Sequence, residues 1–234
     1  MTSPPSLSEI KAFFFDAGGT LFRPHPSVGE VYAEVASRYG LSLDPEELEL
    51  AFHGVWHKKD SYTRPSVKRE EKSWWKLLVH ELFSGFGKMH NFDAFFDELY
   101  DRFARPETWR LFPDTLPTLE ALKKKGKILG VVSNWDDRLF GICEGLGVSP
   151  YFDFILASAV VGAPKPDAKI FKEALKRSAV RPQEALHVGD SLEDDVLGAE
   201  RVGIHGIFLD RKGARKADTF TISTLQFLCL PSEN

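Results

Sequence analysis

Five short, largely apolar runs divide the chain, and each stops at a glycine or a polar residue. The first run, Phe13-Phe14-Phe15, ends at Asp16 and is followed by Gly18 and Gly19. A strand of a parallel sheet is buried on both faces, so its sequence reads as a continuous apolar run. The pattern therefore predicts parallel strands at residues 13–15, 128–132, 152–157, 185–188 and 204–209.

Segments with helical periodicity separate the later strands. We expect Pro166 to open one of them, because proline suits the first turn of a helix. The tail predicts a further short strand and a final helix near residues 223–228. Strands that alternate with helices indicate βαβ units with helices on both faces of one sheet. The predicted fold is therefore α/β, a Rossmann-like, doubly wound parallel sheet, with these helices at residues 113–125, 136–146, 166–178 and 194–202.

An all-helical insert interrupts the alternation after the first strand. Asp44 followed by Pro45 is typical of a helix start, and residues 60–66 read as a polar loop. Phe92, Phe95 and Phe96 share one predicted helix face, so we expect them to pack inside the insert. The insert is predicted to contain helices at residues 28–39, 45–58, 67–83 and 91–103. The domain prediction is an α/β core formed by residues 1–23 and 109–234, and a helical insert formed by residues 24–108.

Composition narrows the function classes. The 234 residues are 43% hydrophobic and 27% charged, as in an ordinary globular protein. A net charge of −4 without a basic run argues against nucleic-acid binding, and no apolar stretch is long enough to span a membrane. Residues 1–10 lack a secretory signal, and Cys143 and Cys229 are too far apart in sequence to suggest a metal site. We expect a cytoplasmic protein with a small-molecule substrate; the oligomeric state cannot be read.

Four polar side chains fall at or just after predicted strand or loop ends: Asp16, Ser133, Lys165 and Asp190. The carboxyl ends of parallel strands point to one edge of a sheet, where ligands bind. These residues can therefore meet although they lie far apart in sequence. A carboxylate nucleophile, a hydroxyl donor, a cation and a second carboxylate suit an anionic substrate such as a phosphoryl group.

In sequence order these positions resemble the motifs of the haloacid dehalogenase superfamily, over nearly the whole chain. The first motif matches Asp16-Ala17-Gly18-Gly19-Thr20, and the second matches Ser133-Asn134. Lys165 matches the third motif, and the acidic cluster from Asp190 to Asp195 matches the fourth. The resemblance implies that the insert is the helical cap of this superfamily. Trp74-Trp75 and Thr108-Trp109 further resemble its rhythmically-expressed-gene-like subgroup.

The resemblance also implies roles in phosphoryl transfer. Asp16 would be the nucleophile and would form a covalent aspartyl intermediate. Ser133 would hydrogen-bond the transferring group, and Lys165 would offset its charge and that of Asp16. The implied phosphate-binding residues are Gly19, Thr20, Ser133, Asn134 and Lys165.

A Mg²⁺ site is implied beside the nucleophile. Mg²⁺ prefers oxygen ligands and keeps several waters. Asp16, the backbone carbonyl of Gly18 and Asp190 would be its protein ligands. Asp195 is preferred over Asp194 as a further ligand or a supporting carboxylate.

Gly18 departs from the superfamily's phosphatases, which carry an aspartate two residues after the nucleophile as general acid and base. Such a group typically contributes about 10²- to 10⁴-fold, so ester hydrolysis should be slow unless His25 or Glu30 substitutes. Three functions remain open: a Mg²⁺-dependent phosphohydrolase that prefers good leaving groups, a phosphonate or carbon–halogen hydrolase, and a binding protein without turnover. Phosphonate cleavage would need a lysine from the insert, and the available ones are Lys58, Lys59, Lys68, Lys72 and Lys76.

Overall fold

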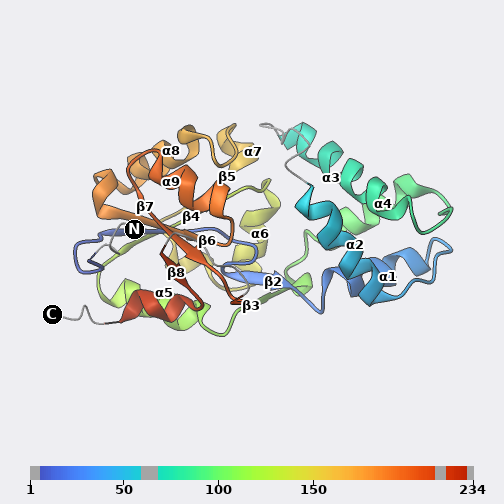
Figure 1. The fold of residues 1–234 in the computed structure, drawn as a ribbon, viewed down its shortest axis with the longest axis horizontal. Helices are drawn as coiled ribbons and strands as arrows, with labels where there is room; N and C mark the ends of the chain where they lie inside the picture. The colour runs from blue at the N-terminus through green and yellow to red at the C-terminus, as the bar shows by residue number, and fades with distance from the viewer. Residues whose placement is uncertain (1–5, 59–67, 214–219, 231–234) are drawn as a thin grey trace.

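A six-stranded parallel sheet forms the centre of the larger lobe (Figure 1). The computed structural model describes the chain except residues 1–5, 59–67, 214–219 and 231–234. The strand order is β5-β4-β1-β6-β7-β8, and every neighbouring pair is parallel. The predicted sheet is thereby confirmed, with strands β1 (Ala12–Phe15), β4 (Ile128–Ser133), β5 (Phe154–Ala157), β6 (Ala185–Gly189), β7 (His205–Leu209) and β8 (Thr221–Ile222).

Strand β1 lies between β4 and β6, and its side chains alternate between two apolar layers. Phe13 and Phe15 belong to the apolar layer that also contains residues of α5 (Thr115–Lys124) and α6 (Arg138–Gly145). Phe14 joins the opposite layer, which contains residues of α8 (Ala168–Ser178) and α9 (Gly198–Glu200). Helices therefore cover both faces of the sheet, as the sequence predicts, and the carboxyl ends of β1 and β6 lie side by side at the sheet's centre.

The helices α1 to α4 form a second lobe beside the sheet (Figure 1); we call it the helical lobe. It has its own apolar cluster, to which Phe95 and Phe96 belong with exposed fractions of 0% and 2%. Tyr32 stacks on Phe83 at a centroid distance of 5.8 Å. The predicted packing role of the aromatic residues is confirmed in this lobe, whose helices are α1 (Val28–Ser37), α2 (Pro45–His57), α3 (Lys68–Phe83) and α4 (Phe92–Arg102).

Two short strands join the lobes. Strand β2 (Phe22–Pro24) pairs antiparallel with β3 (Trp109–Leu111), and Pro24 lies opposite Trp109 in the register. The Phe22 and Trp109 rings are in contact, with centroids 5.4 Å apart. The sequence did not predict this pair, because three-residue strands carry too little alternation to stand out from loops. Both chain connections between the lobes therefore pass through one two-stranded ribbon.

Several helix boundaries differ from the predictions. Helix α8 starts after Asp167, whose side chain accepts a hydrogen bond from the Lys169 amide, so Pro166 precedes the helix rather than opening it. A four-residue helix, α7 (Ser158–Val161), was not predicted. The predicted helix at residues 194–202 begins as a π-helix, Leu192–Leu197, which contains part of the acidic motif. The final helix is a 3-10 helix, Leu225–Cys229, and the predicted loop at 60–66 lies outside the described residues. The remaining 3-10 segments are Pro106–Thr108, Ser149–Tyr151 and Pro182–Glu184.

Cys143 is buried and Cys229 is half-buried, and both are free thiols. Within the described ranges, none of the helices combines the length and the apolar character needed to cross a membrane.

Candidate active site

The carboxyl end of β1 places Asp16 against side chains from two other elements. Ser133, at the end of β4, donates from Oγ to Asp16 Oδ1 at 2.9 Å. Lys165, in the loop before α8, donates from Nζ to the same oxygen at 2.7 Å. Asp16 Oδ2 has no hydrogen-bond partner in the part of the chain that the structure describes. The structure thus brings together three of the predicted site residues and leaves one carboxylate oxygen of Asp16 available for chemistry.

Lys165 is a buried ammonium group that joins two carboxylates. Its Nζ lies 2.7 Å from Asp16 Oδ1 and 2.5 Å from Asp195 Oδ1. Burial alone would lower the pKa of Lys165, but the negative charges of Asp16 and Asp195 outweigh burial and raise that pKa above its ordinary value. The lysine is therefore a permanent positive charge beside the candidate nucleophile.

Asp195 is fully engaged by donors. Oδ1 accepts from Lys165 and contacts His187 Nε2 at 2.9 Å, and Oδ2 accepts from the Ser191 amide at 3.0 Å. Burial would raise the pKa of Asp195, but Lys165 and His187 hold it below its ordinary value. A Cβ at Gly189 would lie 2.2 Å from Asp195 Oδ2, so a glycine is needed there to admit the carboxylate.

Asp190 completes an acidic cluster at the ends of β1 and β6. One carboxylate oxygen from each of Asp16, Asp190 and Asp195 lies within 4.8 Å of the others. Gly19 has φ +82°, and a Cβ on it would lie 2.2 Å from Asp190 Oδ2, so this turn requires glycine. Desolvation by surrounding atoms, followed by the charges of Asp16 and Asp195, raises the pKa of Asp190 to about 8, although its carboxylate reaches the surface.

The acidic cluster can hold a divalent cation. When all three carboxylates are ionised, they and the Lys165 ammonium carry a formal charge of −2. Desolvation and the charges of Asp16 and Asp195 raise the pKa of Asp190, and a bound cation would favour its ionised form. Oxygen donors of this kind are those that Mg²⁺ prefers. The donor set therefore fits such an ion, with Asp16 and Asp190 presenting the accessible oxygens.

Asn134 positions the loop that carries Lys165. Its Nδ2 donates to the Lys165 carbonyl at 2.9 Å, and its Oδ1 accepts from the Lys165 amide at 2.6 Å. Thr20 is buried, and its Oγ1 has no hydrogen-bond partner among the residues described. Its carbonyl accepts from Arg211 at 2.7 Å. Both residues therefore contribute to loop geometry in the structure, and contact of either with a phosphate stays a prediction.

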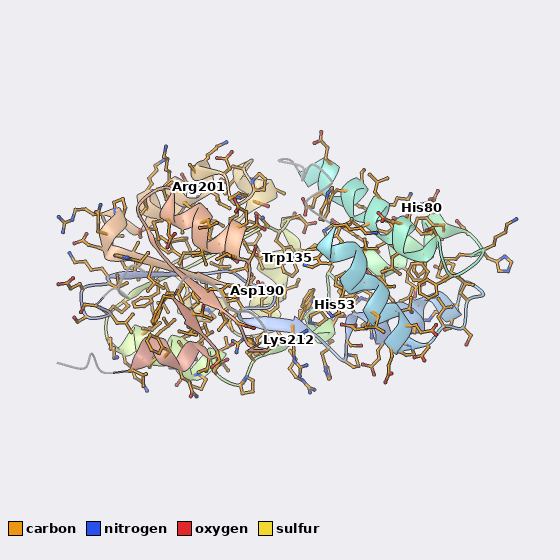
Figure 2. The ribbon with its side chains drawn as sticks, viewed as in Figure 1. His53, His80, Trp135, Asp190, Arg201 and Lys212 are labelled. Atoms are coloured by element: carbon orange, nitrogen blue, oxygen red, sulfur yellow. The ribbon has the colours of Figure 1, made fainter. Side chains whose placement is uncertain are left out.

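Trp135 faces Gly18, the position where the superfamily's phosphatases carry their acid. A Cβ at Gly18 would lie 3.0 Å from Trp135 Cζ3 and 3.6 Å from Cη2. Figure 2 shows Trp135 between the sheet and the helical lobe, near Asp190. A side chain at position 18 would therefore require the indole ring to give way by a few tenths of an ångström.

A polar contact ties the helical lobe to the loop after Trp135. Tyr100, on α4, donates its hydroxyl to Asp136 Oδ2. Arg138 pairs with Asp136 at 2.9 Å, donates to the Tyr100 carbonyl at 3.1 Å and lies 3.5 Å above the Tyr100 ring. Burial would raise the pKa of Asp136, but Arg138 holds it below its ordinary value. We call Tyr100, Asp136 and Arg138 the lobe contact.

Loss of the Tyr100 hydroxyl should loosen the lobe contact. We expect Tyr100→Phe to lower stability by about 1.5 kcal/mol, or about 3–6 °C in Tm, because Asp136 loses a donor. Hydrogen exchange of the amides from 134 to 139 should increase. Tyr39→Phe is the control, since the Tyr39 hydroxyl bonds to Glu98 and Ala94 inside the helical lobe. Equal exchange of the 134–139 segment in the two variants would contradict this role.

The lysines considered for phosphonate cleavage and the two residues considered as substitute acids lie outside the acidic cluster where the structure describes them. Lys72 and Lys76 pair with Asp97 and Asp93 at 2.7 and 2.8 Å. Lys58 and Glu30 are exposed, and Lys59 lies outside the described residues. His25 is half-buried, and its amide donates to the Thr108 carbonyl.

Sequence reasoning missed His187, Trp135 and the lobe contact. His187 is fully buried in β6, and burial lowers its pKa, which favours the neutral ring. Its Nδ1 has no partner within the described ranges, so Nε2 carries the proton donated to Asp195. A histidine inside an otherwise apolar strand was the one available signal. Trp135 directly follows the second motif, but an aromatic residue there reads as packing.

Comparisons with known proteins agree with this architecture. The chain is 36% identical over 207 residues to haloacid dehalogenase-like hydrolase domain-containing protein 3 of Mus musculus, covering 86% of this chain and 82% of that protein. It is 30% identical over 225 residues to the rhythmically expressed gene 2 protein of Drosophila melanogaster, covering 88% and 85%. A crystal structure of a HAD phosphatase from Thermococcus onnurineus superposes with a TM-score of 0.66 at 29% identity, covering 94% and 96%. Residues 10–203 match the haloacid dehalogenase-like hydrolase family, and the chain therefore belongs to that family of hydrolases.

Proposed function

We propose that the protein is a Mg²⁺-dependent phosphohydrolase of small molecules, with Asp16 as nucleophile. The observation that carries the proposal is the Lys165 ammonium held between Asp16 and Asp195, next to the Asp190 carboxylate. This arrangement orients a carboxylate, supplies a positive charge for phosphoryl oxygens and leaves acidic oxygens for a cation. The name of the Thermococcus onnurineus relative, a phosphatase, supports the same assignment.

The proposed reaction has two steps. An oxygen of Asp16 attacks phosphorus, the bond from phosphorus to the leaving oxygen breaks, and the leaving group departs with the electron pair. Water then attacks the phosphorus of the aspartyl phosphate, which releases inorganic phosphate and regenerates Asp16. Ser133 Oγ and Lys165 Nζ are placed to donate to the transferring group, since both already reach Asp16 Oδ1. Gly19, Thr20 and Asn134 are proposed to shape the phosphate pocket through the backbone.

Asp16, Asp190 and the Gly18 carbonyl are the proposed direct Mg²⁺ ligands. A bound Mg²⁺ would supply positive charge against the phosphoryl oxygens. Asp195 remains close enough to be a ligand, but both its oxygens already accept hydrogen bonds. We therefore assign Asp195 chiefly to holding Lys165 in place. We propose that the helical lobe, residues 24–108, is a cap over this site. Residues 1–23 and 109–234, which flank it in sequence, form the core domain.

A substrate panel tests the proposal. Phosphate esters, acyl phosphates, phosphonates and haloacids are assayed with Mg²⁺ and with a chelator. We expect phosphate release that requires Mg²⁺ and that proceeds fastest with good leaving groups, because Gly18 supplies no proton. Halide release without metal would contradict the proposal and identify a dehalogenase. Borohydride trapping of a substrate on a lysine of the helical lobe would contradict it and identify a phosphonate hydrolase. Binding without turnover of any compound would identify a catalytically inactive relative.

Mg²⁺ should also stabilise the folded protein. At about 100 times its dissociation constant, a ligand that binds only the native state adds about 2.7 kcal/mol, or about 5–10 °C in Tm. Asp190→Asn should remove this shift, because it deletes an accessible donor of the acidic cluster. Glu193→Gln is the control, since Glu193 pairs with Arg201 on the surface. An unchanged Mg²⁺ shift in Asp190→Asn would refute the assigned ligand.

A further inference from the structure

The indole of Trp135 lies against the position where a Cβ on residue 18 would stand. An ideal Cβ on Gly18 comes within 3.0 Å of Trp135 Cζ3, which is tighter than ordinary van der Waals contact. Gly18 follows the nucleophile by two positions in a turn whose path is set by the 2.8 Å hydrogen bond from the Gly19 amide to the Phe22 carbonyl. The ring therefore stands directly beside the loop that carries Asp16.

Trp135 is held in this place from both its backbone and its ring. Its amide donates to the Ser133 carbonyl at 3.0 Å, and its carbonyl accepts from the Ala159 amide at 3.1 Å. The Trp109 and Phe22 rings contact the indole edge-on, with centroids 5.1 and 5.8 Å away. The side chain remains partly exposed. The indole thus lies beside the loop of Asp16, in the region between the sheet and the helical lobe (Figure 2).

The chemistry at this position favours leaving groups that are stable as anions. Because Gly18 supplies no proton, a leaving oxygen that is stable as an anion departs most readily. The pKa of a phenol is about 10, several units below the pKa of about 15.7 for water. Without a proton donor, a phenolate is therefore a far better leaving group than an alkoxide, whose basicity is close to that of hydroxide. An aromatic ring also gains contact energy when it packs against another aromatic ring.

We propose that the protein's substrate is an aryl phosphate whose ring packs against Trp135. This inference rests on the proposed phosphohydrolase function. Asp16 forms the bond to phosphorus, the bond between phosphorus and the phenolic oxygen breaks, and the phenolate leaves with the electron pair and takes a proton from water. The aspartyl phosphate is then hydrolysed to inorganic phosphate, so no further reactant is required.

Two substrates separate the effect of the ring from that of the leaving group. Phenyl phosphate carries an aromatic ring, whereas acetyl phosphate has a good leaving group and no ring. We expect Trp135→Leu to lower kcat/KM for phenyl phosphate by about 3- to 10-fold, which corresponds to the usual range of aromatic pair energies. The value for acetyl phosphate should change by less than about 2-fold, and Trp135→Phe should retain most of the activity on phenyl phosphate.

Phe227→Leu controls for the loss of a half-buried ring, because Phe227 packs on Phe220 at the C-terminal 3-10 helix. Phe227→Leu should leave the ratio of kcat/KM for phenyl phosphate to kcat/KM for acetyl phosphate unchanged. Equal losses on both substrates in Trp135→Leu, or no loss on phenyl phosphate, would overturn the aryl inference alone. Failure of the wild type to release phosphate from either compound would overturn the proposed function, and the aryl inference with it.

Discussion

Asp16→Asn should abolish Mg²⁺-dependent phosphate release, with a loss of more than about 10³-fold in kcat, the scale expected when a covalent nucleophile is removed. The amide has almost the same shape as the carboxylate. Its oxygen can still accept from Ser133 Oγ and Lys165 Nζ, which reach Asp16 Oδ1 at 2.9 and 2.7 Å. The site should therefore keep its geometry and lose only the nucleophilic charge.

Steady-state phosphate release, with circular dichroism and thermal unfolding, checks this result. Glu193→Gln serves as a matched loss of a carboxylate outside the cluster, and its kcat should stay within about 2-fold of wild type, the small effect usual for a surface pair. Activity of Asp16→Asn within tenfold of wild type would exclude Asp16 as the nucleophile.

Lys165→Met should have the largest effect on stability. It leaves Asp16 and Asp195 without the ammonium that lies 2.7 and 2.5 Å from their oxygens. Breaking one partner of a buried ion pair costs about 3–5 kcal/mol, which corresponds to a fall of about 6–20 °C in Tm. Phosphate release should fall at least as far as in Asp16→Asn, because the charge that faces the transferring group is lost.

The destabilisation of Lys165→Met should depend on pH. The pKa of Lys165 is raised in the native state. Lys165 therefore contributes its full stabilisation below the pKa of about 10.5 that it has in the unfolded state, and this stabilisation is lost as the pH rises through the native pKa. The pKa of Asp195 is lowered in the native state. Its stabilisation of the fold is therefore present above the unfolded-state pKa of about 3.9 and is lost on acidification. The difference in Tm between wild type and variant should therefore be greatest between about pH 4 and 10.

Two further variants make the measurement specific. Lys169→Met removes an exposed lysine four residues away and should change Tm by little. The double variant Lys165→Met with Asp195→Asn removes one of the two stranded charges, so it should be more stable than Lys165→Met alone. A double variant that is less stable would show that Asp195 does not depend on the lysine.

The core and the chemistry at the strand ends could be predicted because both rest on local patterns. Three phenylalanines in a row are typical of a strand buried on both faces of a sheet, and the first polar residue after them marks the sheet's edge. Parallel pairing then brings Asp16, Ser133 and Asp190 to the same edge. Lys165 comes from the loop before α8, so its position rests on the motif order and not on strand pairing.

Contacts that depend on the path of a loop could not be predicted. The two hydrogen bonds of Asn134 to the backbone of Lys165 depend on the path of that loop, which the sequence does not reveal. Contact of Asn134 with a phosphate stays a prediction. The contact of Tyr100 with Asp136 likewise depends on how two lobes are placed. Asp195, in the π-helical turn at residues 192–197, lies where a Cβ on Gly189 would stand, a contact that no local propensity records.

The ribbon of β2 and β3 limits how the two lobes can be displaced. The chain leaves the core at Pro24 and returns at Trp109, and these residues face each other across one antiparallel ladder. Hydrogen bonds join the two connections into a single joint between the lobes. Phe22 and Trp109 in that joint touch Trp135, so a displacement of the helical lobe at this ribbon would act on the rings that pack against the indole beside Gly18.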